Sequence, residues 1–139
     1  MTETTIRRDI LDGGSILLSA PGCSFEFRRP RPGVLHIIVN GYDRGMFGTG
    51  TLDEIGAAIA RDGKITAFVD ARDVSGVSVE VSEDWTRFFE RNRENLSRVH
   101  VLVGSKVFGL TVAIVQHLSN TGNLIKIYSD PETFADQMK

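Results

Sequence analysis

The chain has 139 residues, of which 41% are hydrophobic and 24% are charged, and its formal net charge at pH 7 is −2. This size and composition are those of one globular domain with its own core, so we predict a single domain over residues 1–139. The slightly negative charge argues against a nucleic-acid-binding protein, which would present a basic face to phosphate groups. Residues 1–13 are expected to form an N-terminal arm that is either disordered or an edge strand.

Cysteine usage and hydropathy indicate which cofactors and which cellular location to expect. Cys23 is the only cysteine, so no internal disulfide can form, and no Cys or His spacing indicates zinc. We therefore expect neither a metal nor another cofactor. The charged N-terminus does not resemble a signal peptide, and no apolar run reaches the roughly 20 residues that cross a bilayer. The cytoplasm is the expected location, and no membrane span is predicted.

The first part of the chain is typical of strands. Residues 15–20 form a short apolar run that a Pro-Gly turn signal ends. Residues 23–28 alternate between apolar and polar, which predicts a half-buried strand with Cys23 in the core. A third apolar stretch, rich in β-branched residues, follows at 34–40.

From residue 51 onward the pattern alternates between helix and strand. Thr51 and Glu54 have the spacing of a capping box, and Ser82 is the expected N-cap of a second helix with Trp85, Phe89 and Leu96 on one face. Further elements are predicted as strands at 64–70, 99–104 and 124–129, and as helices at 105–119 and after Asp130-Pro131. The expected order β-β-β-α-β-α-β-α-β-α predicts an α/β fold, with a mixed, largely parallel sheet that has an antiparallel N-terminal part and about four flanking helices.

This order of elements, together with the stretch Ala-Phe-Val-Asp-Ala-Arg-Asp-Val-Ser-Gly-Val at 67–77, resembles the SpoIIAA-like STAS domains. The resemblance runs from about residue 34 to the C-terminus. A Trp early in the next helix, here Trp85, is similar to the branch that is related to CRAL-TRIO lipid-exchange domains. The resemblance implies a regulatory or binding module, and in its CRAL-TRIO-related branch a bound lipid.

Signalling STAS domains carry a phosphorylatable Ser or Thr where this helix begins, so the resemblance implies Ser82 as the candidate phosphorylation site. The flanking residues depart from the Asp-Ser-Ser-Gly pattern of those domains. Glu83 and Asp84 would also repel a phosphate group, so a plain N-cap is the alternative role of Ser82.

Asp70 and Asp73 follow a predicted parallel strand, at the sheet edge where ligands of open α/β folds usually bind. They either orient a polar ligand or cap their own loop. The three histidines lie at no motif spacing from a Ser, Cys or Asp, so the sequence predicts no catalytic residues and no enzyme.

The predicted helix at 105–119 is apolar on more than one face, whereas a surface helix usually shows one apolar stripe. Three explanations remain open: deep burial, self-association as a homodimer, or contact with an apolar ligand.

Three functions follow. The first is a non-enzymatic regulatory or binding module that acts through protein contacts or a bound small molecule. The second is a carrier or sensor of a lipid or other small apolar ligand, and the third is an enzyme whose site is assembled from separate loops. The predicted ligand- or partner-binding residues are Asp70, Asp73, Ser82, Trp85, Phe89 and Phe108.

Overall fold

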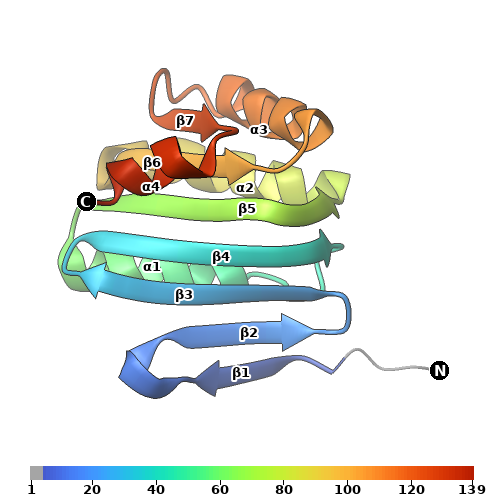
Figure 1. Cartoon of the computed structure of the whole chain (residues 1–139), viewed down its shortest axis with the longest axis vertical. Helices are drawn as coiled ribbons and strands as arrows, with labels where there is room; N and C mark the ends of the chain where they lie inside the picture. The colour runs from blue at the N-terminus through green and yellow to red at the C-terminus, as the bar shows by residue number, and fades with distance from the viewer. Residues whose placement is uncertain (1–4) are drawn as a thin grey trace.

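The computed structural model describes residues 5–139, which form one seven-stranded sheet in the order β1-β2-β3-β4-β5-β6-β7 (Figure 1). The first four strands are antiparallel, and β4 to β7 are parallel. This confirms the predicted α/β class with a mixed sheet. The strands are β1 (Arg7–Ile10), β2 (Ile16–Ala20), β3 (Cys23–Arg31), β4 (Val34–Asp43), β5 (Ile65–Val77), β6 (Leu96–Val103) and β7 (Ile125–Tyr128).

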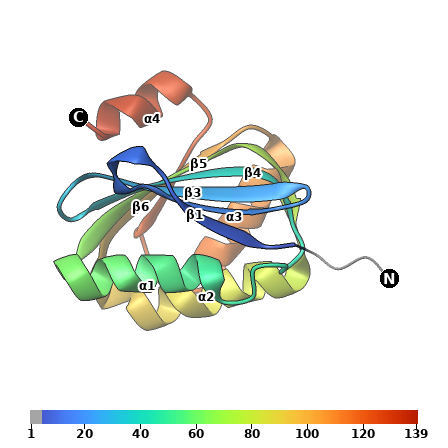
Figure 2. The ribbon, with the colours of Figure 1, turned by 90° about the horizontal axis from the view of Figure 1, so that it is seen from below.

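Four α-helices flank the sheet in two unequal layers (Figure 2). Three of them connect the parallel strands, and because every right-handed crossover advances in the same direction, all three lie on one face. The fourth helix covers part of the opposite face. The helices are α1 (Gly50–Asp62), α2 (Val79–Asn92), α3 (Lys106–Leu118) and α4 (Pro131–Gln137).

The hydrophobic core is divided in the same way. The large cluster lies between the sheet and α1 to α3, and it includes Cys23, as the alternating pattern predicted. A small cluster of Phe68, Leu102 and Phe134 anchors α4 on the other face. The two faces of the sheet therefore have different surroundings, and each strand contributes to both because its side chains alternate.

The opening of the chain adds an edge strand to the three strands of the predicted order, and an edge strand was one of the two alternatives for residues 1–13. Arg7–Ile10 forms the edge strand β1 and pairs with β2 from Arg7↔Ser19 to Ile10↔Ile16. The first four residues of the predicted arm lie outside the described residues.

The start of α2 corrects a prediction. Ser78, not Ser82, is the N-cap, and its hydroxyl accepts a hydrogen bond of 3.2 Å from the Val81 amide. The strand β5 continues to Val77 by pairing with the end of β4, and the Ser78 amide donates to the Asp43 carbonyl at 2.9 Å. These contacts fix the helix start four residues earlier than expected. Ser82 instead lies in the first turn, where its hydroxyl donates to the Val79 carbonyl at 2.8 Å.

Two further boundaries differ. Leu96 is not on the helix but is the buried first residue of β6, after a 3-10 turn at Arg93–Asn95. An apolar residue at this spacing fits both a helical stripe and a strand start, so periodicity alone could not separate them. Thr51 lies buried inside α1, whose N-cap is Thr49, because a turn held by the Gly50 amide and the Phe47 carbonyl starts the helix earlier. Ser105 is the N-cap of α3, and Asp130 is the N-cap of α4.

None of the helices in the described part of the chain is long and apolar enough to cross a membrane.

Candidate functional site

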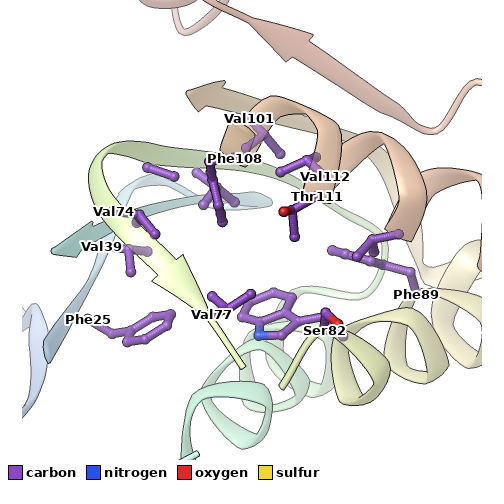
Figure 3. Close-up of a pocket in the computed structure, with 14 residues that line it drawn as sticks. Phe25, Val39, Val74, Val77, Ser82, Phe89, Val101, Phe108, Thr111 and Val112 are labelled. Carbon is purple, nitrogen blue, oxygen red and sulfur yellow. The ribbon is translucent and has the colours of Figure 1, made fainter. Parts of the chain in front are cut away.

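Four of the six predicted binding residues line one apolar cavity of about 90 Å³ between the sheet and the helices α2 and α3 (Figure 3). They are Ser82, Trp85 and Phe89 from α2 and Phe108 from α3. The sheet side of the cavity comes from β3, β4, β5 and β6. The structure therefore brings together residues that lie up to 26 positions apart in the sequence.

Simple periodicities place the side chains. Ser82, Trp85 and Phe89 are spaced i, i+3 and i+7, which puts them on one face of α2. On the sheet side, Val69 and Ala71 alternate toward the cavity along β5.

Aromatic contacts fix one wall of the cavity in place. The indole ring of Trp85 stacks on Phe25 with a centroid distance of 6.4 Å and packs against Phe89 at 5.6 Å. The Trp85 ring is therefore held from both sides, which gives the cavity a fixed aromatic wall.

The cavity has few polar groups. Its two hydroxyls belong to Ser82 and Thr111, and each donates within its own helix, to the carbonyls of Val79 and Val107. No ionisable side chain lines it among residues 5–139. An apolar space without an acid, base or charge suits an apolar occupant and gives no support to catalysis at this site.

Asp70 and Asp73 do not join this site. Val69 and Ala71 face the cavity, so the Asp70 side chain points to the opposite face of the sheet. There it binds Arg72 through the pairs Nε–Oδ1 at 3.1 Å and Nη2–Oδ2 at 2.9 Å. Its Oδ1 also accepts from the Arg72 amide at 3.3 Å, so Asp70 braces its own strand, and Asp73 is exposed.

The helix α3 has two apolar faces, as its composition predicted. Val112 and Val115 face the core, whereas a second row lies in solvent. We name this row the α3 stripe, and its four side chains are between 58% and 77% exposed: Val107, Leu110, Ile114 and Leu118. The spacings of three, four and four residues put them on one side of the helix. Burial in the core therefore accounts for the apolar residues on only one of the two faces of this helix.

The buried ionisable groups lie elsewhere. His36 Nε2 is buried without a hydrogen-bond partner among the described residues. Burial, and then the nearby Arg28, lower the pKa of His36. His100 has a hydrogen-bond partner, because its Nδ1 lies 2.8 Å from the Tyr128 hydroxyl.

Asp43 is a buried carboxylate at the end of β4. Its Oδ1 accepts a hydrogen bond of 2.8 Å from the Gly45 amide, and burial raises the pKa of its carboxyl group. Its place after an apolar strand and before a glycine-rich turn could have marked it as a turn-capping residue. In residues 5–139 no group of His, Cys, Asp and Glu side chains is arranged to hold a metal ion.

The sheet order and the one-sided layer of crossover helices define a mixed α/β domain. No protein-family model matches the chain, and no curated protein sequence matches it. Solved structures do. One is an uncharacterised protein of the DUF3478 family from Shewanella loihica PV-4 with a SpoIIAA-like fold, with a TM-score of 0.63 and 15% identity, over 85% of this chain and 94% of that one.

A second similar structure is an anti-sigma factor antagonist from Mycobacterium paratuberculosis, with a TM-score of 0.59 and 16% identity, over 86% of this chain and 97% of that one. At these identities the likeness concerns the fold. The chain therefore has the SpoIIAA-like fold of STAS domains, which the sequence resemblance implied.

Proposed function

We propose that the chain is a non-enzymatic regulatory module that binds a protein partner through the α3 stripe. The observation that carries this proposal is the stripe itself: four aliphatic side chains, all more than half exposed, in one row. Exposed apolar area costs roughly 25 cal/mol per Å² relative to burial, and contiguous apolar patches on a folded domain mark interaction surfaces.

The fold supports the same function. The structural neighbour from M. paratuberculosis is named as an antagonist of an anti-sigma factor, that is, for its action against another protein. A protein-contact role for the present chain needs a surface rather than a reactive centre. The α3 stripe supplies such a surface, with an aliphatic character that fits an apolar groove or helix face on the partner.

The stripe can be tested with a charged double variant, Leu110→Lys with Ile114→Lys. Both side chains are exposed, so we expect the fold and the free energy of unfolding to stay close to those of the wild type. The matched control is Ile10→Lys, because Ile10 is 71% exposed but lies on the edge strand β1.

Wild type, the stripe variant and Ile10→Lys are each immobilised and exposed to an extract of the host cell, and the proteins that each one retains are compared. Light scattering of each purified protein gives its oligomeric state. We expect a partner that wild type and Ile10→Lys retain and the stripe variant loses. A dimer of the purified chain that only the stripe variant dissociates would identify the partner as a second copy. Equal retention by all three proteins, with an unchanged oligomeric state, would contradict the proposal.

A second candidate function is the binding of a small apolar ligand, which the cavity favours. Its volume of about 90 Å³ is below that of an engineered cavity of about 150 Å³ that accepts benzene, and far below the roughly 300–1,000 Å³ of drug-sized sites. An acyl chain would enter only if α2 and α3 moved apart. We therefore rank protein binding above the lipid carrier, and the relation to CRAL-TRIO domains stays a prediction.

Native mass spectrometry of the purified chain, followed by denaturing extraction, tests this second candidate. A co-purified apolar molecule would support it, and a mass equal to that of the bare chain would count against it. Phosphorylation of Ser82 also stays a prediction. The Ser82 hydroxyl is half-buried and bonded to the Val79 carbonyl, so a kinase would have to break that contact.

A further inference from the structure

A second concavity lies on the other face of the sheet, beside α4, and its lining is polar. We name it the basic pocket; it has a volume of about 360 Å³ and is lined by Arg31, Thr66, Arg98, His100, Lys126 and Gln137, over Val34 and Phe68. It does not share a residue with the cavity beneath α2 and α3.

The register of the parallel strands builds this pocket. Thr66 on β5 lies opposite Arg98 on β6, which forms one row across the sheet. Two residues further along the strands, Phe68 lies opposite His100, and His100 lies opposite Lys126. Residues two apart point to the same face, so both rows face α4. The sheet thus fixes Arg98 and Lys126 at neighbouring positions near the strand starts.

The charge of the pocket is uncompensated. Arg31, Arg98 and Lys126 line it, and no carboxylate does. Among residues 5–139 none of these three cations forms an ion pair. Like charges that share a pocket repel one another, and an anion between them removes that repulsion.

Both guanidinium groups are oriented but retain free donors. Arg31 Nη1 donates to the Met138 carbonyl at 3.0 Å, and Arg98 Nη1 donates to the Asn123 carbonyl at 3.1 Å. Each arginine carries five N–H donors, so several remain for a ligand. The forked guanidinium geometry suits phosphate and carboxylate oxygens.

Uncharged polar side chains complete the site. His100 is held in place, since its ring stacks on Phe68 with a centroid distance of 4.5 Å and an angle of 9°. Burial, and then the charges of Arg98 and Lys126, lower the pKa of His100, so the ring is neutral at pH 7 and adds no further charge. The Thr66 hydroxyl and the Gln137 amide supply neutral hydrogen-bond donors at the pocket wall.

We propose that the basic pocket binds a small molecule that carries a phosphate-type oxyanion. The volume lies within the range of small-ligand sites, and the three cations with their neutral donors match a multiply charged group. The Phe68 and Val34 side chains leave room for a compact organic portion of the ligand. This site is on the face opposite the α3 stripe and does not depend on the proposed protein contact.

The test is a titration of the purified chain with inorganic phosphate and with pyrophosphate, by calorimetry at constant ionic strength. Amide chemical shifts recorded in parallel locate the site. We expect saturable one-to-one binding, tighter for pyrophosphate, with shifts at Thr66, Arg98 and Lys126 and none along α3. Removing one charge–charge contact should weaken pyrophosphate binding about tenfold or more.

The variants are Arg98→Gln and Lys126→Gln, with Lys106→Gln as the control that removes an exposed cation elsewhere. Arg98→Gln also removes the hydrogen bond to the Asn123 carbonyl. If the Arg98→Gln variant does not fold, the Lys126→Gln variant alone tests the proposal. Loss of affinity in the pocket variants and an unchanged affinity in Lys106→Gln support the proposal. No saturable binding at millimolar pyrophosphate, or equal weakening by all three substitutions, would overturn it.

Discussion

Filling the cavity beneath α2 and α3 should stabilise the folded protein. Ala71 on β5 lines the cavity and is itself only 2% exposed. The substitution Ala71→Val adds two carbon atoms at this wall, in a strand position that suits a β-branched residue. We expect the free energy of unfolding to rise.

The magnitude follows from the volume. An unfilled cavity costs about 24 cal/mol per Å³, so 90 Å³ corresponds to an upper limit of about 2 kcal/mol. Burial of two carbon atoms yields at most about 1.6 kcal/mol at about 0.8 kcal/mol each. Since the added atoms fill only part of the space, we expect a gain of about 1 kcal/mol.

Ala67→Val is the matched control. Ala67 is buried in the same core, four residues earlier on the same face of β5, but it does not line the cavity. The same two carbon atoms should overpack this site and cost about 1–3 kcal/mol. The intrinsic preference of valine for strands is common to both variants, so it does not explain a difference between them.

Urea unfolding followed by the fluorescence of Trp85, the only tryptophan, measures both variants, and the m-values should match that of the wild type. Equal destabilisation by Ala71→Val and Ala67→Val would refute the reasoning, because it would mean that no space is available at Ala71. The same variant separates the two candidate functions. A ligand of the cavity would be displaced, whereas a protein bound to the α3 stripe would not.

Two further predictions concern the cap of α2 and the dependence of stability on pH. Ser78→Ala should lower the free energy of unfolding by about 1 kcal/mol because it removes the α2 cap, whereas Ser82→Ala should lower it clearly less. Chemical unfolding measures both values, and a larger loss for Ser82→Ala would identify Ser82 as the cap. Burial lowers the pKa of His36 and of His100 in the folded protein, so as the pH falls the unfolded chain binds protons before the folded one does. The free energy of unfolding should therefore be highest above the unfolded pKa of about 6.5 and decrease as the pH drops below it. Unfolding curves between about pH 7.5 and 5.5 measure this loss, which His36→Gln and His100→Gln should reduce; an equal pH dependence in the wild type and both variants would refute it.

Much of the fold could be predicted because its determinants are local. Period-two alternation at 23–28 and helical spacing in α1 and α3 identify the elements one at a time, and their alternation along the chain then requires parallel strands with crossovers. The aromatic residues of α2 were found for the same reason, since Trp85 and Phe89 lie on one stripe. Local patterns therefore identified the residues that α2 contributes to the cavity.

The errors come from features that depend on pairing between strands. Asp70 looked like the end of a strand, but β5 continues to Val77 along β4, with register shifts that no period-two pattern reveals. The same extension moved the helix cap from Ser82 to Ser78. Asp70 and Trp85, two of the candidate binding residues, therefore lie on different sides of the sheet.

The basic pocket could not be predicted for a related reason. Thr66, Arg98 and Lys126 are single polar residues near the starts of three strands, about 30 positions apart in the sequence. Taken alone, each of them has the pattern of a solvent-facing residue in a half-buried strand. Only the register of β5 to β7 shows that they lie together.

The length of α4 explains why polar residues are needed there, but not why all the charged ones are basic. This helix of seven residues spans about 10 Å, so it covers Phe68 and Leu102 and leaves the strand starts open to solvent. A merely solvated strand would mix the two signs of charge, as β3 does where Arg28 pairs with Glu26. Three cations without a carboxylate in a chain of net charge −2 depart from that pattern. The departure is the physical reason to expect an anion on this face, while the aliphatic α3 stripe on the other face remains available to a protein partner.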